Sequence, residues 1–215
     1  MSSSRPRLIL LAGGQGVGKD RVSGKLVEQL GLVHVSAGQV LRDRRTMRDP
    51  HDPARRTINQ IQAAGELASN PVTCNLIVAR IKLHLRDHQG VLLDGFPRHP
   101  IQAKLVDQIV RDCHLHHDVI GFHLTASAEA RKARLSGAVK QNERSGRNDN
   151  DVEFETREKI YQNQTIPALQ AVGSHNGSTV LDVDAEDKED TWGTDLAIHF
   201  IMDNLTSSFG LMMMN

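Results

Sequence analysis

The sequence has few of the features that indicate a metal cluster or a large charged partner. Its two cysteines, Cys74 and Cys113, lie far apart and match no metal-ligand spacing, so we expect free thiols in a reducing compartment. The 26 lysines and arginines balance 26 aspartates and glutamates, which leaves no net field to attract nucleic acid or an anionic membrane. The partners are therefore expected to be small molecules, and the chain is expected to be a monomer.

Long apolar runs are also absent. No segment approaches the length of a membrane span, and residues 1–7 are too short and polar for a signal peptide, so we expect a cytoplasmic protein. The eleven histidines lack partners at metal-ligand spacing, including those in the segment His114 to His117. We expect the histidines to lie at the surface.

The 215 residues, of which 39% are apolar, are enough for one domain with a full core. Short apolar runs alternate with amphipathic stretches, which predicts an α/β fold with a parallel sheet covered by helices on both faces. The expected strands cover residues 8–12, 33–35, 91–93, 119–124 and 179–183, and the expected helices cover residues 20–30, a segment capped by Ser36, and residues 70–88, 99–113, 128–135, 153–171 and 190–205.

The first apolar run ends in a glycine-rich loop that is typical of phosphate-binding proteins. The G-x-x-x-x-G-K pattern is complete from Gly13 to Lys19, but Asp20 takes the place of the usual Ser or Thr. Such a loop directs backbone N–H groups inward, the following helix adds the positive end of its dipole, and the lysine adds an ammonium group. We therefore expect a polyphosphate site.

A second charged motif follows the third expected strand, from Asp94 to Arg98. The carboxyl ends of parallel strands meet at one edge of a sheet, so this motif is expected beside the phosphate loop. The basic segment from Arg131 to Arg157 is either a solvated loop or a source of arginines that neutralise a transferring phosphoryl group. We favour the second interpretation because a phosphate site needs arginines to neutralise a transferring phosphoryl group.

Together these blocks resemble nucleoside monophosphate kinases, from residue 8 to about residue 200. The most specific parts are Asp94-Gly-Phe-Pro-Arg98 and the order of the blocks. The short stretch before Ser145-Gly146-Arg147 resembles short-lid forms, such as adenylate kinases and uridylate-cytidylate kinases. The other blocks of the resemblance are the loop 13–19, Ser36-Ala37-Gly38 with Leu41-Arg42, Gly65-Glu66-Leu67, Gln102, Arg134, Asp149, and Tyr161 with Thr165 and Pro167.

The resemblance implies a three-layer P-loop fold with a five-stranded parallel sheet, a helical flap over the monophosphate at about residues 36–69, and a short lid at about residues 134–157. The core would comprise residues 7–35, 70–133 and 158–206. Magnesium would be held by Asp94 through water, with Asp20 as a second candidate. The implied ATP-binding residues are Gly14, Gly16, Val17, Gly18, Lys19, Asp20, Arg21, Arg134 and Asp187. The implied monophosphate-binding residues are Ala37, Arg42, Glu66, Leu67, Ala68, Gly95, Arg98, Gln102, Arg147 and Arg157, and the implied catalytic residues are Lys19, Arg98, Arg134, Arg147 and Arg157.

Three features of the sequence leave the function open. Asp20-Arg21 replaces the usual Gly-Thr, so a carboxylate lies near the expected phosphates and a hydroxyl is lost. Ala37 is the residue that pyrimidine kinases usually have at its position, whereas Gln102 is the residue usual in adenylate kinases. The amide of Gln102 also matches the paired donor and acceptor of adenine. We expect an ATP-dependent kinase acting on AMP. The alternatives are a UMP/CMP kinase, a catalytically weak nucleotide-binding regulator and a kinase of another small molecule.

Overall fold

The computed structural model describes residues 8–45, 60, 71–86, 90–115, 119–140, 151–173, 178–187 and 192–209. Within these residues, five parallel strands form one sheet in the order β2-β3-β1-β4-β5. The strands are β1 (Leu8–Gly13), β2 (Val33–Ser36), β3 (Val91–Asp94), β4 (Val119–Thr125) and β5 (Thr179–Asp184). The α/β fold class and the five predicted strands are confirmed.

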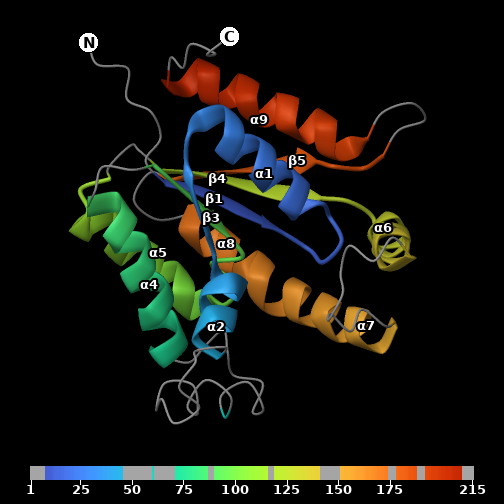
Figure 1. The fold of residues 1–215 in the computed structure, drawn as a ribbon, viewed down its shortest axis with the longest axis horizontal. Coiled ribbons are helices and arrows are strands. Elements are labelled where there is room, and N and C mark those ends of the chain that lie inside the picture. The colour runs from blue at the N-terminus through green and yellow to red at the C-terminus, as the bar shows by residue number, and fades with distance from the viewer. Residues whose placement is uncertain are drawn as a thin grey trace.

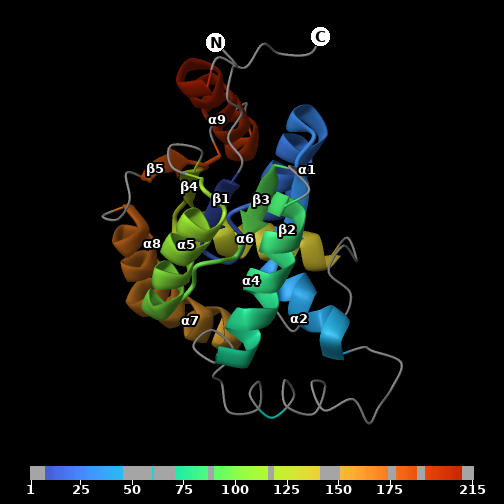
Figure 2. The same cartoon turned by 90° about the vertical axis from the view of Figure 1, so that its left-hand side faces the viewer.

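Helices cover both faces of the sheet (Figure 1). They are α1 (Lys19–Leu30), α2 (Ala37–Arg45), α4 (Pro71–Arg86), α5 (Pro100–Asp112), α6 (Ala128–Lys140), α7 (Asp151–Ile160), α8 (Ile166–Gly173) and α9 (Gly193–Phe209), with a π-helical turn η1 (Tyr161–Thr165) between α7 and α8. Helices α1 and α9 lie on one face, and α4, α5 and α8 lie on the other. Helix α2 packs beside α4 at the edge of the sheet formed by β2 (Figure 2).

The uninterrupted apolar sequence of β1 follows from its central position. Successive side chains of a strand point to opposite faces, so Leu8 and Leu10 join the core beneath α4 and α5, while Ile9 and Leu11 join the core beneath α1 and α9. All four side chains are buried. A strand covered on both faces needs apolar residues at every position, which is the pattern of β1.

Several helix ends lie where the sequence places them. Gly31 ends α1 in the left-handed conformation, with its N–H donating to the Val27 carbonyl. The Ser36 hydroxyl accepts from the Gln39 N–H at 3.4 Å, and the Ser127 hydroxyl accepts from the Ala130 N–H at 3.2 Å. These caps fix α2 and α6 directly after the carboxyl ends of β2 and β4, where the candidate site lies.

Two helices differ from their predicted form. The helix expected over residues 153–171 is divided by η1, where the Ile166 N–H donates to the Tyr161 carbonyl five residues earlier. Pro167 has no N–H and its ring crowds the preceding turn, which favours this wider turn. The apolar spacing within residues 70–88 also predicts that Val72 lies on the buried face of that helix, but Val72 is 40% exposed in α4, and Thr73 and Cys74 are buried instead.

One further expectation was wrong, because His123 of β4 is buried rather than at the surface. Among the described residues, no helix is long and apolar enough to cross a membrane.

Candidate nucleotide site

The loop between β1 and α1 requires glycine at particular positions. Gly16 and Gly18 have φ angles of 82° and 96°, a region that favours glycine. A Cβ at Gly16 would overlap the Arg131 carbonyl oxygen, and one at Gly18 would overlap the Thr194 methyl group. The loop is therefore enclosed by α6 on one side and α9 on the other, and its backbone comes closer to both than any residue with a side chain would allow.

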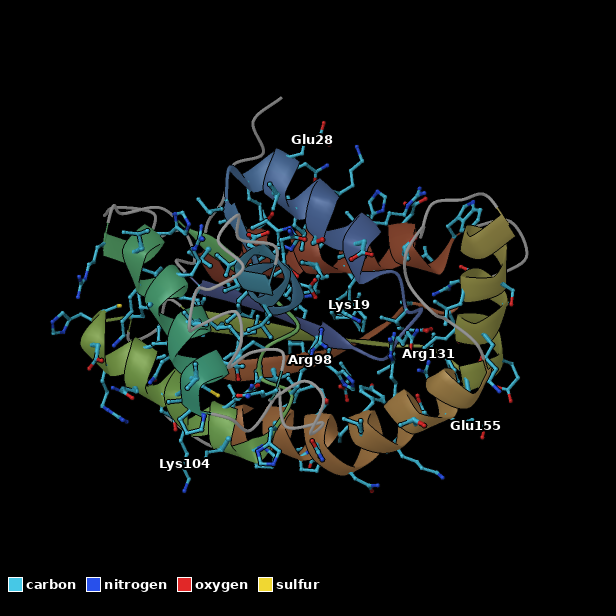
Figure 3. All side chains as sticks on the ribbon, turned by 60° about the horizontal axis from the view of Figure 1, so that its bottom comes forward. Lys19, Glu28, Arg98, Lys104, Arg131 and Glu155 are labelled. Atoms are coloured by element: carbon cyan, nitrogen blue, oxygen red, sulfur yellow. The ribbon has the colours of Figure 1, made fainter. Side chains whose placement is uncertain are left out.

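The Lys19 ammonium lies inside this loop. Its Nζ donates to the Gly13 carbonyl at 2.8 Å and to the Gly14 carbonyl at 2.9 Å. Lys19 is also the first residue of α1, so its charge adds to the positive end of the helix dipole. Figure 3 shows Lys19 and Arg98 both directed toward the middle of the molecule. The ammonium can transfer from these carbonyls to a phosphate without leaving the loop.

Strand β3 brings an acid to the same edge of the sheet. Leu11 of β1 lies opposite Asp94 of β3, and the Gly95 N–H donates to the Leu11 carbonyl at 3.3 Å. The Asp94 side chain is buried, and among the described residues its Oδ1 has no hydrogen-bond partner. His34 Nε2 lies 3.9 Å from Oδ2. A buried carboxylate oxygen that lacks a partner fits the water shell of a magnesium ion, because magnesium prefers oxygen ligands and retains several waters.

The turn after β3 leads to Arg98 and Gln102. The Arg98 N–H donates to Gln102 Oε1 at 2.7 Å, and the Thr165 hydroxyl donates to the Arg98 carbonyl at 3.4 Å. Gln102 is only 3% exposed, and its Nε2 lies 3.8 Å from Cys74 Sγ. A backbone N–H requires an acceptor, so the oxygen of the Gln102 amide must face Arg98. Burial raises the pKa of the Cys74 thiol and keeps it protonated.

Arg134 of α6 connects the loop to the end of β5. Its guanidinium donates to the carbonyls of Val17 at 3.2 Å and Ala185 at 2.5 Å. Two further contacts join it to the Asp187 carboxylate, from Nε to Oδ2 at 3.0 Å and from Nη2 to Oδ1 at 2.7 Å. Asp187 Oδ1 also accepts from the Gly193 N–H at 2.8 Å. The hydrogen bond from Arg134 is the largest cause that lowers the pKa of Asp187, so this carboxylate stays charged.

Asp20 and Arg21, the two residues that depart from the family pattern, lie in the first turn of α1. Arg21 donates from Nε and Nη2 to the Asp195 carboxylate of α9 at 2.9 to 3.2 Å, and its guanidinium lies 5.8 Å from the centre of the Trp192 ring. Asp20 is exposed. Arg21 thus joins α1 to α9, an interaction that the sequence did not indicate.

Comparison with known proteins agrees with this geometry. A family model described as adenylate kinase matches residues 11–176. The chain belongs to the adenylate kinase family. It is 30% identical over 187 residues to human adenylate kinase isoenzyme 5, covering 86% of this chain and 31% of that protein. It is 29% identical over 214 residues to an adenylate kinase of Halobacterium salinarum, covering 90% and 96% of the two chains, and 29% identical over 173 residues to one of Thermosynechococcus vestitus, covering 78% and 84%.

The chain therefore spans about a third of the human relative but nearly the whole of the archaeal one. Family membership supports a phosphotransferase and confirms the resemblance drawn from the sequence. Within the described residues, the edge formed by the carboxyl ends of the strands gathers many of the predicted adenylate kinase site residues. These are the loop 13–19, Ala37, Gly95 and Arg98, with Gln102 and Arg134 on the helices that follow.

Other predicted positions lie outside the described residues or side chains. Glu66, Leu67, Ala68 and Arg147 belong to undescribed segments, and the Arg42 side chain is likewise not described. Arg157 is described and half-buried on α7. The roles of these residues stay predictions.

The sequence did not identify Arg131 individually as a site residue. The sequence places Arg131 in a basic segment, yet its side chain is buried and donates to the Gln15 carbonyl of the loop. Arg131 lies four residues before the buried Leu135, on the same face of α6. That spacing is the feature of the sequence that could have identified Arg131 as a residue on the buried face of the helix.

Proposed function

We propose that the protein is an ATP-dependent nucleoside monophosphate kinase that transfers the γ-phosphoryl group of ATP to AMP, giving two molecules of ADP. The observation that carries the proposal is the pairing of β1 with β3. It brings the glycine loop with Lys19 and the Asp94-to-Arg98 turn to one edge of the sheet. A donor site and an acceptor site that share one edge suit direct transfer between two nucleotides.

Phosphoryl transfer requires mainly positioning and positive charge. Lys19 would exchange the Gly13 and Gly14 carbonyls for the β- and γ-phosphates of ATP. Arg98 and Arg157 would hold the monophosphate, Arg134 would act on the ATP side, and Arg147 of the lid would contact the transferring group. No acid–base pair is needed.

Magnesium would be held by Asp94 through water, with Asp20 as a further oxygen ligand. Asp94 Oδ1, which has no hydrogen-bond partner within the described part of the chain, supports the first assignment. When bound, the ion neutralises part of the negative charge on the phosphates. The contribution of Asp94 itself is to orient the waters of the ion from a buried, fixed position at the end of β3.

The orientation of Gln102 supports AMP as the acceptor. Because the amide oxygen accepts the Arg98 N–H, the amide cannot rotate by half a turn without leaving that N–H unsatisfied. A fixed amide offers an acceptor and a donor side by side, matching N6–H and N1 of adenine. Guanine presents the opposite pattern and should be a poor acceptor.

Two alternatives each have an observation in their favour. Ala37 is buried at the start of α2 and has no hydroxyl to offer a purine, which favours a UMP/CMP kinase. Asp20 places an exposed carboxylate at the loop, which favours a catalytically weak nucleotide-binding regulator. The paired acceptor and donor of Gln102 disfavour uracil, which would leave buried groups unsatisfied, but cytosine presents the same pattern as adenine. We favour AMP over CMP because Gln102 is the residue typical of adenylate kinases, and water can replace the hydroxyl that Ala37 lacks.

A coupled assay that measures ADP formation from ATP with AMP, CMP, UMP or GMP tests the proposal. The highest kcat/KM is expected with AMP, with weaker activity on CMP or UMP. A preference for CMP over AMP would contradict the acceptor assignment. ATP binding measured by calorimetry without turnover on any monophosphate would indicate the regulator.

A further inference from the structure

We propose that Arg131 is a positioning residue that, through Glu158, holds the phosphate loop and α7 in one relative arrangement. This proposal rests on the proposed kinase function, because it assigns Arg131 a role in the geometry of that site. Figure 3 shows Arg131 directed from α6 toward the interior, whereas Glu155 of α7 points outward.

The Arg131 side chain, 4% exposed, joins three separate segments. Its Nε donates to the Ala126 carbonyl at 3.1 Å in the turn after β4, and its Nη1 donates to the Gln15 carbonyl of the phosphate loop at 3.4 Å. The same Nη1 donates to Glu158 Oε2 of α7 at 2.7 Å. A guanidinium group is planar and rigid, so fixing one of these partners constrains the other two.

Aromatic rings and a second hydrogen bond fix the α7 side of this contact. The Arg131 guanidinium carbon lies 5.4 Å from the centre of the Phe154 ring and 5.7 Å from that of Tyr161. Glu158 Oε1 accepts from Gln162 at 2.9 Å. The hydrogen bond from Arg131 is the main cause that lowers the pKa of Glu158, so the carboxylate stays charged at neutral pH.

Tyr161 ties the same region to the sheet. Burial raises the pKa of Tyr161 to about 12, so its hydroxyl stays neutral. That hydroxyl forms a short hydrogen bond with His123 Nε2, and His123 Nδ1 lies 2.7 Å from Asp182 Oδ1 of β5. The start of η1 is therefore held against β4 and β5, and α7 leads into it from Glu158.

Arg157 gives this arrangement a functional consequence. It directly precedes Glu158 on α7, so the ion pair sets where Arg157 lies relative to the phosphate loop. Stability alone is a weak explanation for the pair, because replacing a largely buried ion pair by well-packed apolar side chains of similar size is often neutral or stabilising. A site that depends on positioned charge loses rate when its groups shift by about 1 Å.

The first test compares Glu158→Gln with Glu155→Gln on the same helix. Glu155 is 67% exposed and lies 4.0 Å from Lys132, which makes it a matched control. Glu158→Gln should lower kcat/KM for ATP by about tenfold or more and weaken ATP binding in calorimetry, while Glu155→Gln leaves both unchanged. Glu158 is only partly buried, so the variant should fold. Equal behaviour of the two variants would overturn the proposal.

The second test separates positioning from stability. Arg131→Met leaves the Glu158 carboxylate without its main partner, and adding Glu158→Leu removes that charge. The double variant should regain most of the melting temperature that the single variant loses, while its kcat/KM stays low. Recovery of both quantities would overturn the proposal, because the pair would then serve stability alone.

These results remain distinct from a failure of the proposed function. If the wild-type protein turned over none of the four monophosphates, the kinase assignment would fail. The ATP dissociation constants of Glu158→Gln and Glu155→Gln would still decide the role of Arg131, because they need no turnover. Unequal constants support positioning of the loop, and equal constants contradict it.

Discussion

The two sides of the candidate site differ in how their polar groups are bonded. On the proposed donor side, comprising loop 13–21 with Arg134 and Asp187, the cations contact the protein's own acceptors. Lys19 contacts two loop carbonyls, and Arg134 contacts Asp187 and two carbonyls. On the proposed acceptor side, comprising Ala37, Asp94, Arg98 and Gln102, the backbone of Arg98 orients an amide, and among the described residues Asp94 Oδ1 has no hydrogen-bond partner.

This difference suggests two modes of recognition. ATP would bind by exchange, which means that its phosphates would replace the protein acceptors that these cations now contact. The net affinity for ATP would therefore be the difference between the free energies of the two sets of contacts. The acceptor base would bind to an amide whose direction is already set, which lowers the ordering cost of the complex. Substitutions on the two sides should therefore change different quantities, namely turnover and ATP affinity on one side and acceptor selectivity on the other.

The largest effect is expected on the donor side, for Lys19→Ala. Removing the ammonium should lower kcat by about 10²- to 10³-fold, as loss of a single charge-stabilising donor does. The fold should persist, because the Lys19 side chain lies only partly buried, outside the two apolar cores, and donates to carbonyls of a loop. Lys25→Ala is the control, since Lys25 lies on the same helix in an exposed pair with Glu28. Near wild-type turnover in Lys19→Ala would contradict the phosphate-loop assignment.

Magnesium should have the next largest effect, because Asp20 adds a carboxylate to the donor side. Without the ion this charge repels phosphate, so ATP affinity measured by calorimetry should fall by about tenfold or more when magnesium is omitted. Asp20→Gly should reduce this dependence. Equal ATP affinity with and without the metal would exclude Asp20 from the site.

Gln102→Asn tests the acceptor side. The shorter side chain cannot accept the Arg98 N–H and still reach the base, so the AMP-to-CMP ratio of kcat/KM should fall by about tenfold. KM for ATP should not change. Gln108→Asn is the matched control, because Gln108 lies exposed on α5 beside Asp112. An unchanged ratio would show that Gln102 does not touch the base.

The sequence predicted the parallel fold, and it placed the candidate site at the carboxyl edge of the sheet, because both inferences depend on local patterns. The glycines and Lys19 are adjacent in the chain, and Ser36 and Ser127 cap the helices that follow them. The contacts that the sequence missed join distant residues. Arg131 with Glu158 and Arg21 with Asp195 are 27 and 174 positions apart, and no local pattern encodes such a pairing.

Asp187→Asn tests whether Arg134 leaves Asp187 when ATP binds. The amide keeps an acceptor for the Gly193 N–H but loses the charge that holds Arg134, so KM for ATP should fall by about two- to fivefold. Because Arg134 lowers the pKa of Asp187, the effect should stay constant between about pH 6 and 8. Asp184→Asn, nearby on β5, is the control. A rise in KM would show instead that Asp187 helps to bind ATP.

The smallest effect is expected for Arg21→Thr, at the rim of the donor side. Arg21 was predicted to bind ATP, but its side chain is 54% exposed and pairs with Asp195. An exposed ion pair contributes roughly 0.2–1 kcal/mol to stability, and α1 and α9 are also joined through a shared buried core. The melting temperature should therefore change little, and kcat/KM for ATP should stay within about threefold of wild type. Asp195→Asn should behave in the same way, because it breaks the same pair from the other helix. A loss of more than about tenfold in Arg21→Thr alone would mean that Arg21 leaves Asp195 to bind ATP, which would make it a third cation that binds by exchange.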